Sequence, residues 1–160
     1  YRRCYSTGSR FPGIRDVAAV FTLLNPMEAR MIPDLIHDTS TTIAVVGASD
    51  SPGKSGGRIY RNLKAKGYTV YAVNPRANTV DGDPAYATLA DLPAPADIVD
   101  LVVPAAVGIG LVGQLDDPPP FVWVQPGAES PELAELLDDK GVPHVADGSC
   151  IMVETRAVTP

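Results

Sequence analysis

Short apolar segments alternate with helical ones from residue 43 onward, and this predicts an α/β fold: a Rossmann-type, doubly wound, mainly parallel five-stranded sheet in a single domain. The apolar segments are rich in Val, which is typical of strands buried on both faces. Helices lie between most successive strands, as parallel pairing with right-handed crossovers requires. A length of 160 residues and a hydrophobic fraction of 45% suit one globular core of ordinary size.

The first half of the domain contains one clear strand–helix–strand unit. Four apolar residues, Ile43–Val46, predict a strand that continues through small residues into a helix at Arg58–Lys66. Gly67 is a natural residue to follow that helix, and Thr69–Val73 is the next strand. Weaker signals follow: a turn-rich segment at 78–84 with Val80 in a short strand, and one helical turn at 86–92.

The second half contains two further strand–helix units and a closing strand. Proline residues separate them, with Pro104 before one helix and Pro118–Pro120 before a strand. Ser130 is a favoured N-cap, and Gly141 is a favoured residue beyond the end of the same helix. The expected elements are strands Ile98–Val103, Phe121–Val124 and Val142–Val145 and helices Ala105–Leu115 and Pro131–Lys140.

Residues 1–40 differ in character from residues 41–160. The first fifteen residues are basic and contain glycine without a clear period. We expect an N-terminal extension over residues 1–40, with a short helix at Glu28–His37, followed by the Rossmann-type domain over residues 41–160. The sequence does not begin with Met, which is compatible with a fragment or with an upstream extension.

Composition disfavours several classes of protein. A net charge of −6 and a pI near 4.7 argue against a nucleic-acid-binding surface, which needs a broad basic patch. No apolar run reaches the 18 or more residues of a membrane span. Cys4 and Cys150 lie too far apart in sequence to suggest a disulfide framework or a metal site. We expect a cytoplasmic protein without nucleic-acid or membrane partners, and the oligomeric state stays open, with a homodimer among the options.

The residues between the first strand and its helix are typical of an anion site. Gly47–Ser49 and Ser55–Gly57 lack bulk, so a phosphate can approach the unpaired N–H groups at the helix start. The helix dipole favours the same negative charge, and Lys54 adds a mobile positive one. The alternative is an ordinary βα turn whose glycines serve packing only. On the first interpretation, Gly47→Val blocks ligand binding while the domain stays folded.

Two common phosphate motifs come close to this loop without matching it. A P-loop has four residues between its first glycine and Gly-Lys-Ser, whereas five residues separate Gly47 from Gly53 here. The dinucleotide fingerprint requires a second glycine where this chain has Ser49. A nucleotide hydrolase is therefore disfavoured.

The end of the second strand separates the remaining coenzymes. Asn74, Pro75 and Arg76 stand where an NAD site usually has an acidic residue for the ribose hydroxyls. A guanidinium there would pair with a phosphate on the ribose, which NADP and coenzyme A both carry. The alternative is a solvated loop arginine.

Several short motifs, taken together and in order, resemble those of the small stand-alone CoA-binding domain proteins, over Ile43 to Arg156. This family is similar in fold to the CoA-binding domain of the succinyl-CoA synthetase α-subunit. The resemblance implies a CoA-binding Rossmann domain over residues 41–160 that takes coenzyme A or an acyl-CoA, without established catalysis in most members. The motifs are Gly47-Ala48-Ser49, Gly67–Val70, Val73–Arg76, Tyr86 with Leu89, Asp97–Asp100, Trp123–Gln125, and Asp147 with Cys150–Glu154.

The resemblance also implies binding roles for the matching positions. The diphosphate end falls to the first βα loop, the adenosine or its phosphate to the end of the second strand, and a Val-Pro turn lies beside CoA in the synthetase subunit. The chain departs from the family at Pro126, inside a Gln-x-Gly pattern. The implied binding residues are Gly47, Ala48, Ser49, Lys54, Ser55 and Gly56, then Asn74, Pro75 and Arg76, then Val103 and Pro104.

No catalytic residues are evident in the sequence. Cys150 is interpreted as a buried structural thiol, dispensable for coenzyme binding, because its neighbours are apolar and no Lys or Arg is adjacent. We expect a protein that holds the CoA diphosphate at the first βα loop, rather than an enzyme. An NADP-dependent oxidoreductase and a nucleotide-binding regulatory subunit remain the alternatives.

Overall fold

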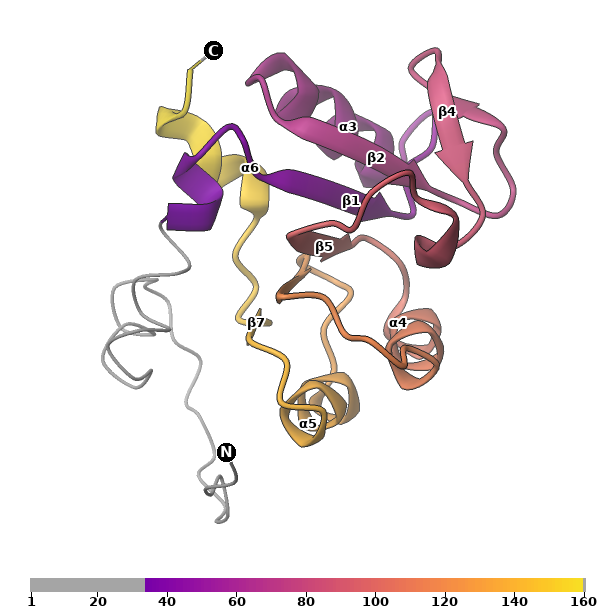
Figure 1. Ribbon diagram of the computed structural model, residues 1–160, viewed down its shortest axis with the longest axis vertical. Coiled ribbons are helices and arrows are strands. Elements are labelled where there is room, and N and C mark those ends of the chain that lie inside the picture. The colour runs from indigo at the N-terminus through magenta and orange to yellow at the C-terminus, as the bar shows by residue number, and fades with distance from the viewer. Residues whose placement is uncertain (1–33, 160) are drawn as a thin grey trace.

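The computed structural model describes residues 34–159. These residues form a seven-stranded sheet of order β3-β4-β2-β1-β5-β6-β7 between two layers of helices (Figure 1). The β3–β4 pair is antiparallel, and the other strand pairs of the described sheet are parallel. The strands are β1 (Thr42–Val46), β2 (Thr69–Val73), β3 (Thr79–Val80), β4 (Asp83–Tyr86), β5 (Ile98–Leu101), β6 (Phe121–Val124) and β7 (His144–Val145).

The helices divide between the two faces of the sheet. Residues of α3 and α6 join one apolar core cluster, and residues of α4 and α5 join the other. Residues 1–33 of the predicted extension, with most of the predicted helix Glu28–His37, lie outside the described range. The described part of that helix, residues 34–37, is helical. The helices are α3 (Ser55–Ala65), α4 (Ala105–Gly113), α5 (Pro131–Asp139) and α6 (Ile151–Glu154), with 3-10 turns at Leu89–Asp91 and Thr155–Ala157.

Strand β1 lies at the centre of the sheet and is buried on both faces. Ile43 and Val45 pack into the cluster of α3 and α6, whereas Ala44 and Val46 pack into the cluster of α4 and α5. This alternation explains why the strand is apolar without interruption. Because β1 pairs with β2 on one side and with β5 on the other, the strand order reverses beside it.

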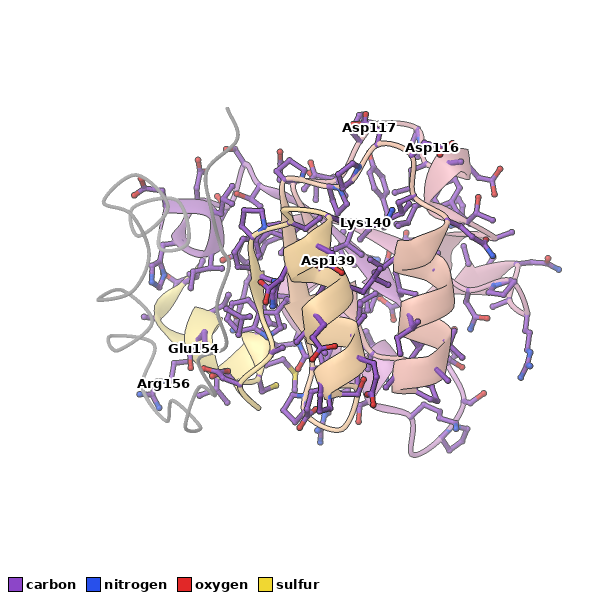
Figure 2. The ribbon with its side chains drawn as sticks, turned by 90° about the horizontal axis from the view of Figure 1, so that it is seen from below. Asp116, Asp117, Asp139, Lys140, Glu154 and Arg156 are labelled. Atoms are coloured by element: carbon purple, nitrogen blue, oxygen red, sulfur yellow. The ribbon has the colours of Figure 1, made fainter. Side chains whose placement is uncertain are left out.

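Helices α4 and α5 lie side by side on their face of the sheet (Figure 2). The predicted N-cap is confirmed, since Ser130 Oγ accepts a hydrogen bond from Leu133 N at 3.1 Å. At the other end of α5, Lys140 Nζ donates to Leu115 O at 3.0 Å and ties the helix to the segment that follows α4.

The predicted fold class is confirmed, but the strand count was too low. A hairpin, β3–β4, extends the sheet beyond β2 where a turn-rich segment was expected. Its turn residues, Asp81 and Gly82, both have positive φ (53° and 81°), as a two-residue type I′ turn requires. The helical turn predicted at 86–92 shortens to the 3-10 turn at Leu89–Asp91 because Tyr86 belongs to β4.

Candidate functional site

The carboxyl ends of β1 and β5 meet at the point where the strand order reverses, the usual ligand position in open α/β sheets. Two of the predicted binding residues touch there. A Cβ on Gly47 would lie 2.9 Å from Val103 Cγ1 and 3.0 Å from Val102 O. Gly47 also has a φ of +95°, which a branched residue tolerates poorly. The structure therefore argues against the expectation that Gly47→Val leaves the domain folded, because this change strains the backbone and the packing together.

Helix α3 begins at Ser55, three residues before the predicted start, so Ser55 and Gly56 belong to its first turn. The helix start presses directly on the β1–α3 loop. A Cβ on Gly56 would lie 2.1 Å from Gly47 O, and one on Gly57 would lie 2.0 Å from Ser49 O. Glycine is thus required at both positions, because the backbone of α3 packs directly against the backbone of the β1–α3 loop.

The N-terminus of α3 has unmet capacity for negative charge. Lys54, the N-cap residue, makes no side-chain capping hydrogen bond, and the first turn contains no acidic residue. Lys54 and Arg58 are exposed, and neither forms an ion pair with any residue between 34 and 159. Cations at the positive end of a helix dipole are unfavourable, so an anion bound here would relieve both the dipole and the charges.

Asn74, at the end of β2, holds the β1–α3 loop in place. Its Nδ2 donates to Ala48 O at 2.8 Å, and its Oδ1 accepts from Arg76 N at 2.9 Å. The amide therefore ties two of the predicted binding segments together. The guanidinium of Arg76 is exposed beside this link.

Sequence reasoning missed Asp50 as an anchor of the loop. Its carboxylate accepts two hydrogen bonds from Asp81 N, at 2.9 and 3.1 Å, and pairs with Arg61 Nη1 at 3.1 Å. Ser49 Oγ meanwhile accepts from Ser51 N at 3.1 Å. The loop is thus fixed by its own polar side chains, by α3 and by the β3–β4 hairpin.

The structure brings some predicted residues together and leaves others at the surface. Gly47, Ala48, Ser49, Gly56, Asn74 and Val103 are joined by the contacts described above. The remaining predicted residues are solvent-exposed: Lys54, Ser55, Pro75, Arg76 and Pro104. Pro104 also serves as the N-cap of α4, where its C=O accepts from Val107 N at 2.8 Å.

Cys150 lies away from this loop, on the segment that packs α6 against α3. It is partly exposed, so its interpretation as a buried thiol is wrong. It also has a basic neighbour that the sequence did not reveal. Burial lowers the pKa of Lys66, whereas the nearby Cys150 acts in the opposite direction. Lys66 Nζ donates to Met152 O at 3.1 Å and to Thr155 Oγ1 at 2.8 Å.

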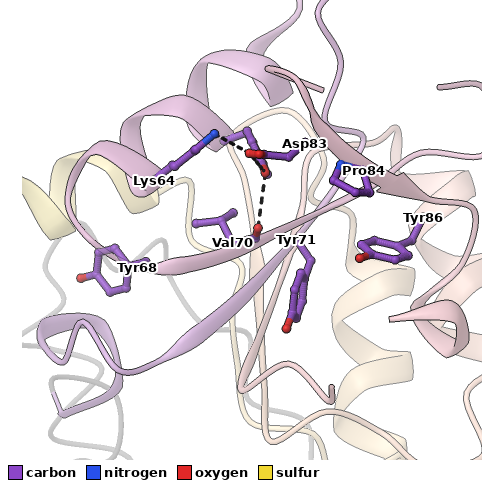
Figure 3. Close-up of a pocket in the computed structure, with 8 residues that line it drawn as sticks. Lys64, Tyr68, Val70, Tyr71, Asp83, Pro84 and Tyr86 are labelled. Carbon is purple, nitrogen blue, oxygen red and sulfur yellow. Dashed lines mark hydrogen bonds and ion pairs between the residues drawn. The ribbon is translucent and has the colours of Figure 1, made fainter. Parts of the chain in front are cut away.

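A cavity of about 310 Å³ lies between α3, β2 and β4, and none of the predicted binding residues lines it (Figure 3). Lys64 and Asp83 point toward one another there and form an ion pair. Tyr60 Oη donates to the same carboxylate at 2.8 Å. The pKa of Tyr60 is raised, mainly by burial and secondly by this hydrogen bond. The cavity walls are residues Tyr60, Lys64, Tyr68, Val70, Tyr71, Asp83, Pro84 and Tyr86.

No group of three or more His, Cys, Asp and Glu side chains within residues 34–159 could hold a metal ion. No helix in the same range combines the length and the apolar character needed to cross a bilayer.

Comparison with known proteins decides the family. A family model described as a CoA binding domain matches residues 41–156. The chain belongs to this CoA-binding domain family. The family and the Rossmann-type fold predicted from the sequence are thereby confirmed.

Some relatives of this CoA-binding domain protein are matched over almost their whole length, and others are much longer CoA ligases that are matched over a small part. The uncharacterized protein YneT of Bacillus subtilis is 31% identical over 136 residues, which cover 84% of this chain and 98% of that protein. A conserved hypothetical protein from Pyrococcus furiosus is 39% identical, with a TM-score of 0.68, over 72% of this chain and 99% of that one. The ADP-forming acetate–CoA ligase I of Archaeoglobus fulgidus is 43% identical over 63 residues, which are 39% of this chain but only 9% of the ligase.

Proposed function

We propose that this protein binds coenzyme A or an acyl-CoA and holds the coenzyme's diphosphate on the loop Gly47–Ser49 at the start of α3. The observation that carries the proposal is the uncapped N-terminus of α3, flanked by the exposed cations Lys54 and Arg58. A diphosphate supplies the negative charge that this helix end lacks. Membership of a family described as CoA-binding gives independent support.

The residues at this edge of the sheet fit the coenzyme chemically. The first-turn glycines present backbone N–H groups without side-chain bulk, and Lys54 supplies a mobile charge for the diphosphate. The exposed Arg76 guanidinium is suited to the 3′-phosphate on the ribose, since guanidinium and phosphate pair through charge-assisted hydrogen bonds. Val103 and Pro104 follow β5, and the Val103 side chain lies against Gly47.

We propose further that the protein binds without turnover of its own. When bound, the coenzyme itself supplies a thiol or thioester. The residues of this chain bind and orient it. Cys150 and His144 are not joined by a hydrogen bond in the described structure, and His144 Nδ1 instead lies 2.9 Å from Val142 O. A Cys–His pair needs such contact for acyl transfer.

Calorimetry with CoA, dephospho-CoA and NADP tests the proposal. We expect CoA to bind most tightly, and we expect loss of the 3′-phosphate to weaken binding by about 10-fold or more, as removal of a charge-assisted contact does. Arg76→Ala should remove the difference between CoA and dephospho-CoA, while the exposed control Arg156→Ala keeps it. Equal affinity of the parent for CoA and dephospho-CoA would overturn the role of Arg76. Tighter binding of NADP would overturn CoA as the ligand.

A further inference from the structure

One pair of polar side chains lies deep in the sheet, away from the exposed cations. Asp100, in β5, is fully buried, and Gln125, directly after β6, is 3% exposed. Gln125 Nε2 donates a hydrogen bond to Asp100 Oδ1 at 2.8 Å.

The residues beside Asp100 on the neighbouring strands are apolar. In register, Asp100 stands between Val45 of β1 and Trp123 of β6. Its neighbours Val99 and Leu101 face α4 and α5, so the Asp100 side chain points to the face that α3 and α6 cover. The Asp100 carboxyl group is therefore shielded from solvent.

Each member of the pair has one oxygen without a partner. Asp100 Oδ2 and Gln125 Oε1 are both buried and accept no hydrogen bond from the described residues. An ionised carboxylate can only accept, so these two oxygens cannot satisfy one another while Asp100 is charged. Buried acceptors and buried charges left in this state are costly, and native proteins rarely retain them.

One added proton changes this arrangement completely. We propose that Asp100 carries a proton on Oδ2 and donates it to Gln125 Oε1, so that the two side chains close a ring of two hydrogen bonds. The amide donates to Oδ1 and the acid donates back to the amide oxygen. The ring satisfies both orphaned oxygens and removes the buried charge. Loss of the proton to solvent breaks one bond and restores the charge.

The electrostatics of the site agree with this geometry. Burial raises the pKa of Asp100 to about 7, and the Gln125 hydrogen bond opposes that shift. Helices α3 and α6 and the segments that flank them carry titratable side chains that are buried or half-buried on this face, and none of them contributes to the shift. These side chains are Tyr60, Lys66, Tyr68, Asp147, Cys150 and Glu154.

The ring makes the carboxyl edge of the sheet sensitive to pH. The pKa of Asp100 in the folded chain lies above its ordinary value of 3.8, so the folded state holds the extra proton between about pH 4 and pH 7. The stabilisation is complete at low pH and is lost as the pH rises through about 7. Gln125 also begins the turn into α5, where its C=O accepts from Ala128 N at 2.9 Å. We therefore expect this turn to loosen on the alkaline side.

Thermal unfolding at a series of pH values tests the ring with Asp100→Asn. The Asn side chain can donate to Gln125 Oε1 at any pH, so it mimics the protonated acid. We expect the parent to lose about 3 °C or more of its unfolding midpoint between about pH 5 and pH 8, and Asp100→Asn to lose measurably less. The exposed control Asp116→Asn should keep the parent's slope. An Asp100→Asn slope equal to the parent's would overturn the proposal.

A second measurement needs no variant and covers the case in which Asp100→Asn does not fold. The carboxyl ¹³C resonance of Asp100 is followed by NMR through a pH titration of the full chain. A midpoint above about pH 5.5 supports the protonated ring, because an ordinary Asp titrates near 4. A midpoint below that value overturns it.

Discussion

The positively charged side chains at the two ends of helix α3 have different surroundings. At its C-terminal end, Lys64 pairs with the carboxylate of Asp83, and Lys66 donates to two oxygens of the segment around α6. At its N-terminal end, Lys54 and Arg58 are exposed and have no ion-pair partner within residues 34–159. Both ends belong to the same eleven-residue helix, so the difference does not come from helix propensity.

This difference separates structural charges from charges available to a ligand. Cations near the C-terminus of a helix are favoured by its dipole, and here they also have protein partners. Cations near the N-terminus oppose the dipole. Natural proteins break such local rules mainly at functional sites, where another component compensates. The uncapped end of α3 is therefore the part of the helix where we expect the coenzyme.

The largest effect is expected from Gly56→Ala, which disturbs the packing at the N-terminal end of α3 without changing its charge. The new Cβ would lie 2.1 Å from a backbone oxygen that cannot move aside. We expect roughly 3 kcal/mol or more of lost stability in urea unfolding, together with loss of CoA binding.

The control for this change is Gly110→Ala. Gly110 lies in α4 with nothing within 4 Å of its Cβ position, so Ala should stabilise the helix by about 0.5–1 kcal/mol. If the two variants were equally stable, the close approach of α3 to the loop would be refuted.

The second prediction exchanges the two kinds of lysine. Lys54→Ala should leave the unfolding midpoint unchanged and weaken CoA binding by roughly 3- to 10-fold at low salt, and by less at high salt, because it removes a partly screened charge. Lys64→Ala should lower the midpoint slightly and leave CoA affinity unchanged. Calorimetry at two ionic strengths measures the first effect. Equal CoA affinity of the parent and Lys54→Ala at low salt would mean that the backbone alone forms the anion site.

The third prediction concerns acid stability at the C-terminal end. Hydrogen bonds from Lys64 and then from Tyr60 lower the pKa of Asp83 below its ordinary value of 3.8. The stabilisation is therefore present above that value and is lost as the pH falls below it. Asp83→Asn should be less stable than the parent at neutral pH, and the gap should narrow at about pH 2–3. Thermal unfolding of both proteins between neutral pH and about pH 2 tests this prediction. A stability difference that does not change with pH would argue against the Lys64–Asp83 pair.

The smallest effect is expected from Cys150→Ser. The thiol is partly exposed beside Lys66, at the end of α3 that we consider structural. We expect a stability cost of about 0.5 kcal/mol and unchanged CoA affinity. Rapid thiol labelling that CoA suppresses would place Cys150 in the ligand site instead.

Elements with strong periodicity could be predicted from the sequence, and elements governed by tertiary contact could not. The apolar run Ile43–Val46 identified β1 because that strand is buried on both faces. The start of α3 was placed too late because Gly56 and Gly57 are poor helix formers, and only their contact with the loop explains them. Of the β3–β4 hairpin only the first strand was expected, as a short strand at Val80, although Asp81-Gly82 is a strong turn signal; Pro84 within the second strand hides its strand character.

The candidate site shows the same division. The small residues of the β1–α3 loop could be proposed as an anion site from the sequence because phosphate binding of this kind requires access to the backbone N–H groups. The role of Asn74 as a tie to Ala48 O could not, since a side-chain-to-backbone bond between two loops has no sequence pattern. Asp100 gave no signal of its own because one acid within an apolar strand does not reveal what lies opposite it.

The hydrogen bond from Asp81 N to the Asp50 carboxylate links the β1–α3 loop to the β3–β4 hairpin. The β3–β4 hairpin joins the rest of the sheet through only two residue pairs with β2, so its amides should exchange with solvent sooner than those of the central strands. The turn of the same hairpin donates the hydrogen bonds that hold the Asp50 carboxylate of the β1–α3 loop. A coenzyme that binds this loop and restrains it further should therefore slow amide exchange in the hairpin, so that the hairpin amides report binding although they do not contact the ligand.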